Sequence, residues 1–121
     1  MARVLVVDDS IMMRRNLTKL LVQDGHEVVA EAKNGMLAYT AYEKSQPDFV
    51  TMDITMPIMD GISSVKKIIG AYPDAKIIMI SAQNQQTMVY DALKSGAKNY
   101  LLKPIRIEKL RQIIEQILKP S

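Results

Sequence analysis

Five side chains that could do chemistry stand at the ends of short apolar stretches of the sequence. They are the carboxyls of Asp8, Asp9 and Asp53, the hydroxyl of Ser81 and the amine of Lys103. In an open parallel α/β sheet, ligands bind beyond the carboxyl ends of the strands. If the apolar stretches are such strands, we expect the five groups to converge on one rim of the sheet.

The expected rim carries an excess of negative charge. Three ionised acids and one lysine sum to −2. Two carboxylates ~4 Å apart repel each other by ~4 kcal/mol at an effective dielectric constant of about 20. Such a site either takes up a proton or binds a hard divalent cation. Mg²⁺ is the natural candidate, because it binds few carboxylates, keeps several waters and is often completed by a phosphate oxygen.

The apolar stretches are typical of buried parallel strands, because they are short, rich in β-branched residues and free of polar alternation. They cover residues 4–7, 28–30, 49–52, 77–80 and 100–102. Between them, apolar residues recur at helical spacing, clearly in 13–21, 62–69 and 110–118 and more weakly in 36–44 and 85–94. This alternation predicts an α/β fold of five (βα) units, a doubly wound parallel five-stranded sheet with helices on both faces.

Polar residues and glycines mark the expected helix ends. The predicted N-caps are Ser10, Asn34, Asp60 and Asn84, and the predicted helix stops are Gly25 and Gly96. Pro47 and Pro73 stand just before the third and fourth strands, where a helix must already have ended. These end signals agree with the five (βα) units.

Length and composition limit the classes of protein. With 121 residues, 48% of them hydrophobic, the chain is expected to form one domain over residues 1–121. No apolar run approaches the ~18–20 residues of a membrane span or forms a signal peptide, so we expect a cytoplasmic protein that contacts no membrane. The absence of cysteine excludes thiol catalysis. A single histidine, His26, argues against a catalytic triad and is expected in an exposed turn.

Charge is distributed unevenly along the chain. Residues 1–60 carry 6 basic and 9 acidic side chains, a sum of −3, whereas residues 61–121 carry 10 and 4, a sum of +6. The basic residues are either scattered and solvated or form a surface for an acidic partner. Because no basic run is clustered, the net charge of +3 does not support direct binding of nucleic acid.

Four segments together carry a resemblance to a known family. They are Val7–Ser10, Met52–Gly61, Ile80–Ala82 and Tyr100–Pro104. In this order and spacing they are similar to the receiver domains of two-component response regulators, most of all to stand-alone chemotaxis regulators. The resemblance covers residues 3–118 and implies a flavodoxin-like sheet with strand order 2-1-3-4-5.

The resemblance implies a metal-dependent phosphoacceptor at the acidic rim. Asp53 would accept the phosphoryl group. Asp9, Asp53 and the backbone carbonyl of Thr55 would bind Mg²⁺ directly, and Asp8 would act mainly through water. Phosphoryl transfer depends on positioning and charge neutralisation, which these groups would supply.

The resemblance also implies a phosphate-binding and switching set. Ser81, Ala82 and Lys103 would hold the phosphoryl group, and the Lys103–Pro104 peptide bond is expected to be cis. Tyr100 would be an aromatic switch that turns into the space behind Ser81 when Ser81 moves toward the phosphoryl group. The alternative is that Tyr100 is an edge-strand tyrosine with a solvated hydroxyl.

Loop residues near the site have implied roles of their own. Pro57 and Gly61 would shape the loop that leads into the third helix. Thr55 and Gln83 stand two residues after the phosphoacceptor and two after Ser81. At these positions the side chains would tune self-dephosphorylation, since amide or acidic groups there can orient the hydrolytic water.

The implied output surface lies on the fourth helix, fifth strand and fifth helix. It would include Tyr90, Lys94, Tyr100, Arg106 and Lys109. The expected partners are a chemotaxis-type histidine kinase and, as target, the flagellar motor switch or another protein. An alternative is a receiver domain excised from, or serving, a transcriptional regulator or a phosphorelay.

A small aspartate-dependent phosphatase is the less favoured alternative. Phosphatases of the haloacid dehalogenase type resemble Asp-x-Asp-x-Thr, whereas Asp53 is followed two residues later by Thr55, so the second acid is missing. The glycine motifs Gly-x-Gly-x-x-Gly and Gly-x-x-x-x-Gly-Lys of nucleotide-binding enzymes are absent from the sequence as well. We therefore expect no enzyme, but a domain that assists only its own phosphorylation and dephosphorylation.

Overall fold

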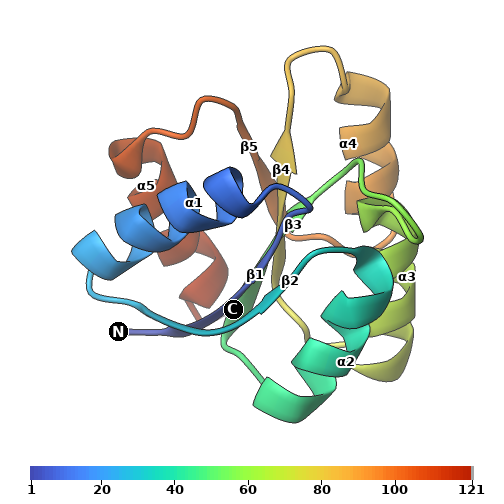
Figure 1. Cartoon of the computed structure of the whole chain (residues 1–121), viewed down its shortest axis with the longest axis horizontal. Coiled ribbons are helices and arrows are strands. Elements are labelled where there is room, and N and C mark those ends of the chain that lie inside the picture. Colours follow the sequence, from blue (N-terminus) through green and yellow to red (C-terminus); the bar gives the residue numbers. More distant parts are fainter. Residues whose placement is uncertain (121) are drawn as a thin grey trace.

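The structure is a computed structural model that describes residues 1–120, in which five strands alternate with five helices (Figure 1). The strands are β1 (Arg3–Val7), β2 (Glu27–Ala32), β3 (Phe49–Asp53), β4 (Ile77–Ser81) and β5 (Asn99–Leu102). The helices are α1 (Ile11–Gln23), α2 (Gly35–Ser45), α3 (Gly61–Ala71), α4 (Gln86–Lys94) and α5 (Ile107–Leu118). All strand pairs are parallel, in the order β2-β1-β3-β4-β5, which confirms the predicted fold class and strand order.

The sheet separates two hydrophobic cores. Along β1, Val4 and Val6 belong to one core and Leu5 and Val7 to the other, because successive side chains of a strand alternate between its faces. Helices α1 and α5 cover the first core, and α2, α3 and α4 cover the second, as Figure 1 shows. Helices therefore lie on both faces of the sheet, as the sequence predicts.

Three of the four predicted N-caps are confirmed. Ser10, Asn34 and Asp60 each accept a hydrogen bond from a backbone N–H in the first turn of α1, α2 and α3. The prediction for Asn84 is wrong, because the N-cap of α4 is Gln85, which makes no side-chain capping bond. Several neighbouring polar residues could cap this helix. The sequence does not show that Gln85 precedes the helix directly and that its side chain bonds instead to Thr55 in the loop after β3. Both predicted glycine stops have positive φ.

The prediction that His26 lies in an exposed turn is wrong. Its side chain is only 9% exposed, and its ring packs edge-on against Phe49 at a centroid distance of 5.9 Å. Nδ1 accepts a hydrogen bond from the backbone N–H of Ala2 at 3.1 Å, and Nε2 lies 3.3 Å from a carboxylate oxygen of Asp24. The imidazole is buried because the start of β1 passes beside the turn between α1 and β2. His26 therefore has a structural role.

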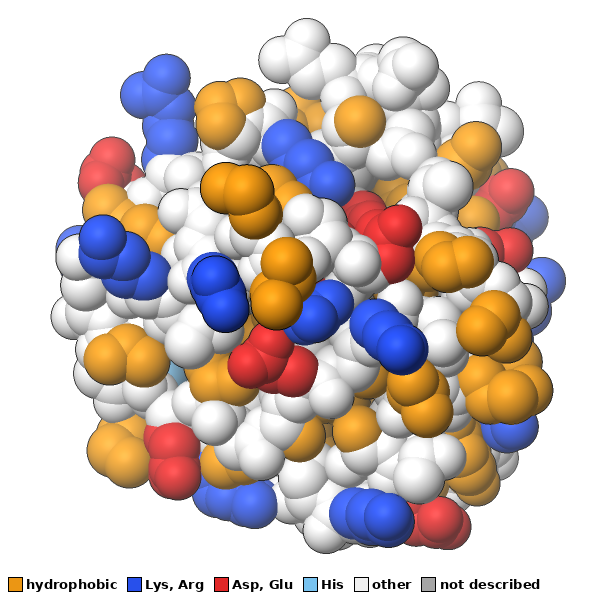
Figure 2. All heavy atoms as spheres, viewed as in Figure 1, with side chains coloured by type: hydrophobic (Ala, Val, Ile, Leu, Met, Phe, Trp, Pro, Cys, Tyr) orange, Lys and Arg blue, Asp and Glu red, His pale blue; other side chains and the backbone are white. Residues whose placement is uncertain are grey.

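Scattered charges and a local cluster of basic residues, the two interpretations of the charge distribution, are found on different parts of the surface. On the face shown in Figure 2, acidic and basic side chains are interspersed among hydrophobic ones, with no field of a single sign. Between β5 and α5, however, Lys103, Arg106 and Lys109 line a hollow of about 610 Å³. Within residues 1–120, no helix is both long and apolar enough to cross a bilayer.

Candidate functional site

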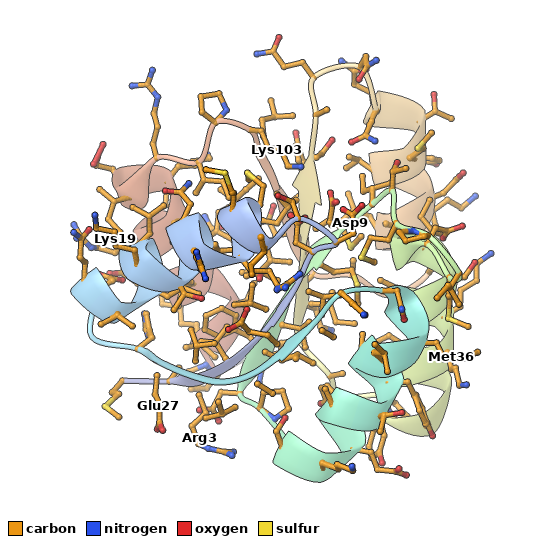
Figure 3. All side chains as sticks on the ribbon, viewed as in Figure 1. Arg3, Asp9, Lys19, Glu27, Met36 and Lys103 are labelled. Carbon is orange, nitrogen blue, oxygen red and sulfur yellow. The ribbon has the colours of Figure 1, made fainter. Side chains whose placement is uncertain are left out.

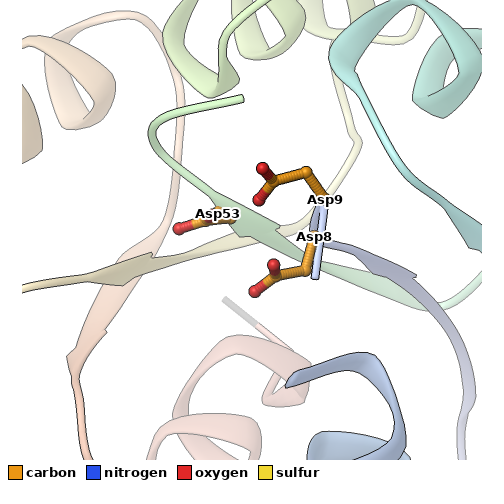
Figure 4. Close-up of side chains that lie close together, drawn as sticks. All are labelled: Asp8, Asp9 and Asp53. Atoms are coloured by element: carbon orange, nitrogen blue, oxygen red, sulfur yellow. The ribbon is translucent and has the colours of Figure 1, made fainter. Parts of the chain in front are cut away.

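Three carboxyl groups meet at the carboxyl edge of the sheet. Asp8 and Asp9 follow β1, and Asp53 is the last residue of β3. One oxygen from each carboxyl lies within 4.8 Å of the other two, and Figure 4 shows the three side chains close together. Asp8 and Asp53 are buried, whereas Asp9 is exposed. The predicted acidic rim is thus present.

The lysine and the hydroxyl of the predicted site lie at the same edge. The Lys103 amine is 3.4 Å from a carboxylate oxygen of Asp53. Ser81 ends β4, whose Ile80 is in register with Asp53 on the neighbouring strand. Figure 3 shows Lys103 and Asp9 toward one end of the sheet, opposite the strand starts marked by Arg3 and Glu27. All five predicted groups therefore belong to one edge.

Backbone hydrogen bonds fix the acidic side chains. The backbone N–H of Ile54 donates to Asp53 at 3.0 Å, and that of Ser10 donates to the Asp8 carboxylate at 2.9 Å. A further residue, Arg14, donates from its guanidinium to the backbone carbonyl of Asp8 at 2.7 Å. Sequence reasoning missed Arg14, although its place in the first turns of the helix after Asp8 is a usable signal.

The pKa values of the carboxyl groups reflect the crowding of negative charge. Burial, followed by the charge of Asp8, raises the pKa of Asp53 to about 6, against the opposing effects of Lys103 and the Ile54 N–H. Burial also raises the pKa of Asp8 above its usual value. Ionised acids are thus held in an unfavourable setting, which a cation would relieve.

We expect ionisation of Asp53 to destabilise the fold. Because its pKa in the folded state, about 6, lies above the ordinary 3.8, the folded chain binds this proton more tightly than the unfolded chain. Relative to Asp53→Asn, the wild-type free energy of unfolding should therefore fall as the pH rises from about 4 to 6, by on the order of 2 kcal/mol after solvent screening. Urea unfolding of both proteins with EDTA measures this, and a difference independent of pH would contradict it.

The acidic cluster fits a hard divalent cation. It offers oxygen donors alone, its formal charge with Lys103 is −2, and one side, at Asp9, is open to solvent. Oxygen ligands from one or two carboxylates, completed by water, are the ligands that Mg²⁺ prefers. Asp8, Asp9 and Asp53 are therefore the side chains that would hold the ion.

The loop after β3 has a constrained backbone. The N–H of Gly61 donates to the carbonyl of Ile54 at 2.7 Å, which brings the start of α3 onto the end of β3. Pro57 lies in this loop, and Ile58 has φ +69, a rare conformation for a β-branched residue. Such strain is found at functional sites. Pro57 and Gly61, which the resemblance expects to shape this loop, thus lie within it and at its end.

The predicted phosphate-binding and tuning residues lie at the end of β4 and in the loops that follow β3, β4 and β5. The Ser81 hydroxyl donates to the backbone carbonyl of Ala82 at 2.7 Å. The Thr55 hydroxyl accepts a hydrogen bond from Gln85, a residue that sequence reasoning missed. Gln83 lines the hollow that also contains Lys103.

Two further predictions concern β5 and the chain after it. The Lys103–Pro104 peptide bond is cis, as predicted. Tyr100 is 39% exposed and lines a hollow of about 380 Å³ together with Ser81 and residues of α4. Space for the predicted turn of Tyr100 therefore lies beside Ser81.

Comparison with known proteins identifies the family. The sequence profile of the response regulator receiver domain matches residues 4–115. The chain belongs to this family. Its fold and the acidic edge of its sheet agree with this assignment.

The relatives include proteins of similar length. The chain is 47% identical to the chemotaxis protein CheY of Bacillus subtilis over 116 residues, covering 96% of this chain and 97% of that protein. It is 44% identical to the chemotaxis protein CheY of Thermotoga maritima over 117 residues, covering 97% and 98%. A chain in the crystal structure of the CheX–CheY–BeF3–Mg²⁺ complex from Borrelia burgdorferi has a TM-score of 0.92 at 35% identity, covering 98% of this chain and 90% of that one.

Proposed function

We propose that this receiver domain is a chemotaxis phospho-switch, in which Asp53 accepts a phosphoryl group from a histidine kinase with the help of Mg²⁺. The observation that carries the proposal is the meeting of three carboxylates and Lys103 at one edge of the sheet. Support for chemotaxis comes from the CheY relatives, which match nearly their whole length.

The charges at the site favour a metal-dependent reaction. Bound Mg²⁺ would supply two positive charges and bring the rim from −2 to about zero. Replacing the Asp53 carboxylate by a phosphoryl group of roughly −2 then leaves about −1, against about −3 without metal. A carboxylate oxygen of Asp53 attacks phosphorus, and the bond to the donor breaks with its electron pair leaving on the donor. The product is an acyl phosphate, which water can cleave.

Incubation with Mg²⁺ and acetyl phosphate tests the proposal. We expect about one phosphoryl group per chain by intact mass, stable in acid and labile in base, because phosphate is held as a mixed anhydride. No incorporation under these conditions would contradict the phosphoacceptor role. Sustained turnover of a phosphomonoester would instead favour the phosphatase alternative.

The surface formed by α4, β5 and α5 is the proposed site for the flagellar motor switch or another target. Tyr90 is 62% exposed, and the Lys94 amine lies 5.3 Å from the centre of its ring. Arg106 and Lys109 line the neighbouring hollow, so the surface is suited to an acidic partner. Calorimetric titration of the motor switch protein with and without BeF3⁻ tests this assignment, since equal affinities would show that the site and the surface are not coupled.

Tyr100 is the proposed link between the site and that surface. It shares the hollow of about 380 Å³ with Ser81, so movement of Ser81 toward a phosphoryl oxygen opens space into which the ring can turn. Inverting a 1:99 population requires a preference of ~5.5 kcal/mol. Two or three charge-assisted hydrogen bonds of ~1.5–3 kcal/mol each supply it.

We expect Thr55→Asn to speed self-dephosphorylation. Thr55 lies exposed two residues after Asp53, where an amide can orient the attacking water, whereas its hydroxyl is bonded to Gln85 in the wild type. The decay rate of base-labile phosphate, after removal of the donor, measures the effect. We expect an increase of about tenfold, the order of one positioned hydrogen bond in a transition state. Equal decay of the two phosphorylated proteins would contradict the tuning role.

A further inference from the structure

Two of the three donors predicted to hold the phosphoryl group, Ser81 and Ala82, are hydrogen-bonded to residues outside the acidic cluster. The Ser81 hydroxyl donates to the backbone carbonyl of Ala82 at 2.7 Å. The backbone N–H of Ala82, which is the only donor that an alanine has, points to the side-chain oxygen of Gln85 at 2.7 Å. A phosphoryl oxygen would therefore have to displace two existing partners.

The amide of Gln85 joins two loops of the site. While its oxygen accepts from Ala82, its nitrogen donates to the Thr55 hydroxyl at 3.0 Å. One side chain thus connects the loop after β4 to the loop after β3, 30 residues apart in sequence. Both its donor and its acceptor are used, so the amide is held in one orientation.

Gln85 makes this bridge from the start of a helix, where its side chain would be expected to cap the helix. Gln85 is the N-cap of α4, where a side chain ordinarily accepts a hydrogen bond from the first turn of the helix. Here no side-chain capping bond is made. The side chain bonds to Ala82 and Thr55 and not to the helix, so the first turn of α4 has no side-chain hydrogen bond from its N-cap residue.

We infer that Gln85 is a positioning residue that acts as a latch: it occupies the Ala82 N–H before phosphorylation and must release it to a phosphoryl oxygen. The inference rests on the proposed function. The latch amide bonds to the hydroxyl of Thr55, not to the backbone carbonyl through which Thr55 would bind Mg²⁺, and neither of its two hydrogen bonds involves Asp8, Asp9 or Asp53, so metal binding and phosphoryl binding are affected differently. Removing the latch should favour the phosphoryl-bound state and leave Mg²⁺ binding unchanged.

The test is the variant Gln85→Ala, titrated with beryllofluoride in the presence of Mg²⁺ and followed by amide NMR. We expect beryllofluoride to bind about three- to tenfold more tightly, the effect of one net hydrogen bond that no longer has to be broken. The affinity for Mg²⁺ alone should stay the same. Hydrogen exchange of the Ala82 amide, measured without ligand, should become faster.

Two further variants separate the latch from a general effect on α4. Thr87→Ala removes an exposed polar side chain from the first turn of the helix and should leave both measurements at the wild-type values. Gln85→Glu keeps an acceptor for Ala82 but loses the donor to Thr55 and adds negative charge. It should retain slow exchange at Ala82 and bind beryllofluoride more weakly.

The outcomes distinguish the latch from the proposed function. If the wild type binds beryllofluoride and Gln85→Ala binds it equally well, the latch is overturned and the phosphoacceptor role stands. If no variant binds beryllofluoride, the proposed function fails and the latch loses its regulatory role with it. Unchanged exchange of Ala82 in Gln85→Ala also overturns the latch.

Discussion

Asp53→Asn should incorporate no phosphoryl group from acetyl phosphate under conditions where the wild-type chain accepts about one. The amide has almost the shape of the carboxyl group, so the packing of this buried side chain is retained. It lacks the anionic oxygen that attacks phosphorus, and the neighbouring amine of Lys103 cannot replace that oxygen. Intact mass spectrometry measures the loss, which should exceed a hundredfold in rate.

The matched control is Asp74→Asn, which removes an exposed acid from the loop before β4. It should be phosphorylated as fast as the wild type. EDTA should stop the wild-type reaction, because without metal the phosphorylated rim would carry a charge of about −3. Incorporation into Asp53→Asn at the wild-type level would place the phosphoacceptor elsewhere.

Gly61→Ala should destabilise the fold by about 3 kcal/mol, at the upper end of the effect of overpacking. A Cβ at Gly61 would collide with the backbone oxygen of Asp53 and would lie 3.0 Å from the Cα of Ile54. Both are backbone atoms, so α3 must move away from the end of β3 and take the site loop with it. Urea unfolding followed by circular dichroism measures the loss of stability.

Gly70→Ala, in the same helix, is the matched control for Gly61→Ala. Apart from the chain neighbours and the backbone of its own helix, nothing in residues 1–120 lies within 4 Å of a Cβ added at Gly70, so alanine only removes the flexibility of glycine from the helix. We expect it to stabilise the fold by about 0.5–1 kcal/mol. The two substitutions should therefore change the free energy of unfolding in opposite directions. Equal changes would show that the close approach at Gly61 does not determine stability.

The fold and the meeting of the acids could be predicted because both follow from local patterns. Short β-branched runs form parallel strands, and the geometry of a parallel sheet brings the residues after each run to one edge. Asp8, Asp53 and Lys103 are far apart in sequence, yet each stands at the end of a strand or directly after one. Their convergence needed no knowledge of side-chain packing.

The parts that were missed depend on contacts between distant segments. His26 is buried because the start of β1 happens to pass over it, and Asn84 is not a cap because the neighbouring Gln85 is tied to another loop. Gln85 itself stands in a polar run in which each residue has similar chemistry. Only the tertiary arrangement distinguishes the amide that reaches Thr55 and Ala82.

The division of the interior into two cores has a consequence for how such a protein can diversify. Leu101 of β5 packs with α5 in one core, whereas Val89 and Ala92 of α4 pack in the other. A substitution beneath α4 therefore reshapes one element of the proposed target surface without disturbing the packing that anchors α5. The sheet acts as a partition, so new partner specificity can evolve on one side while the other side keeps the molecule folded.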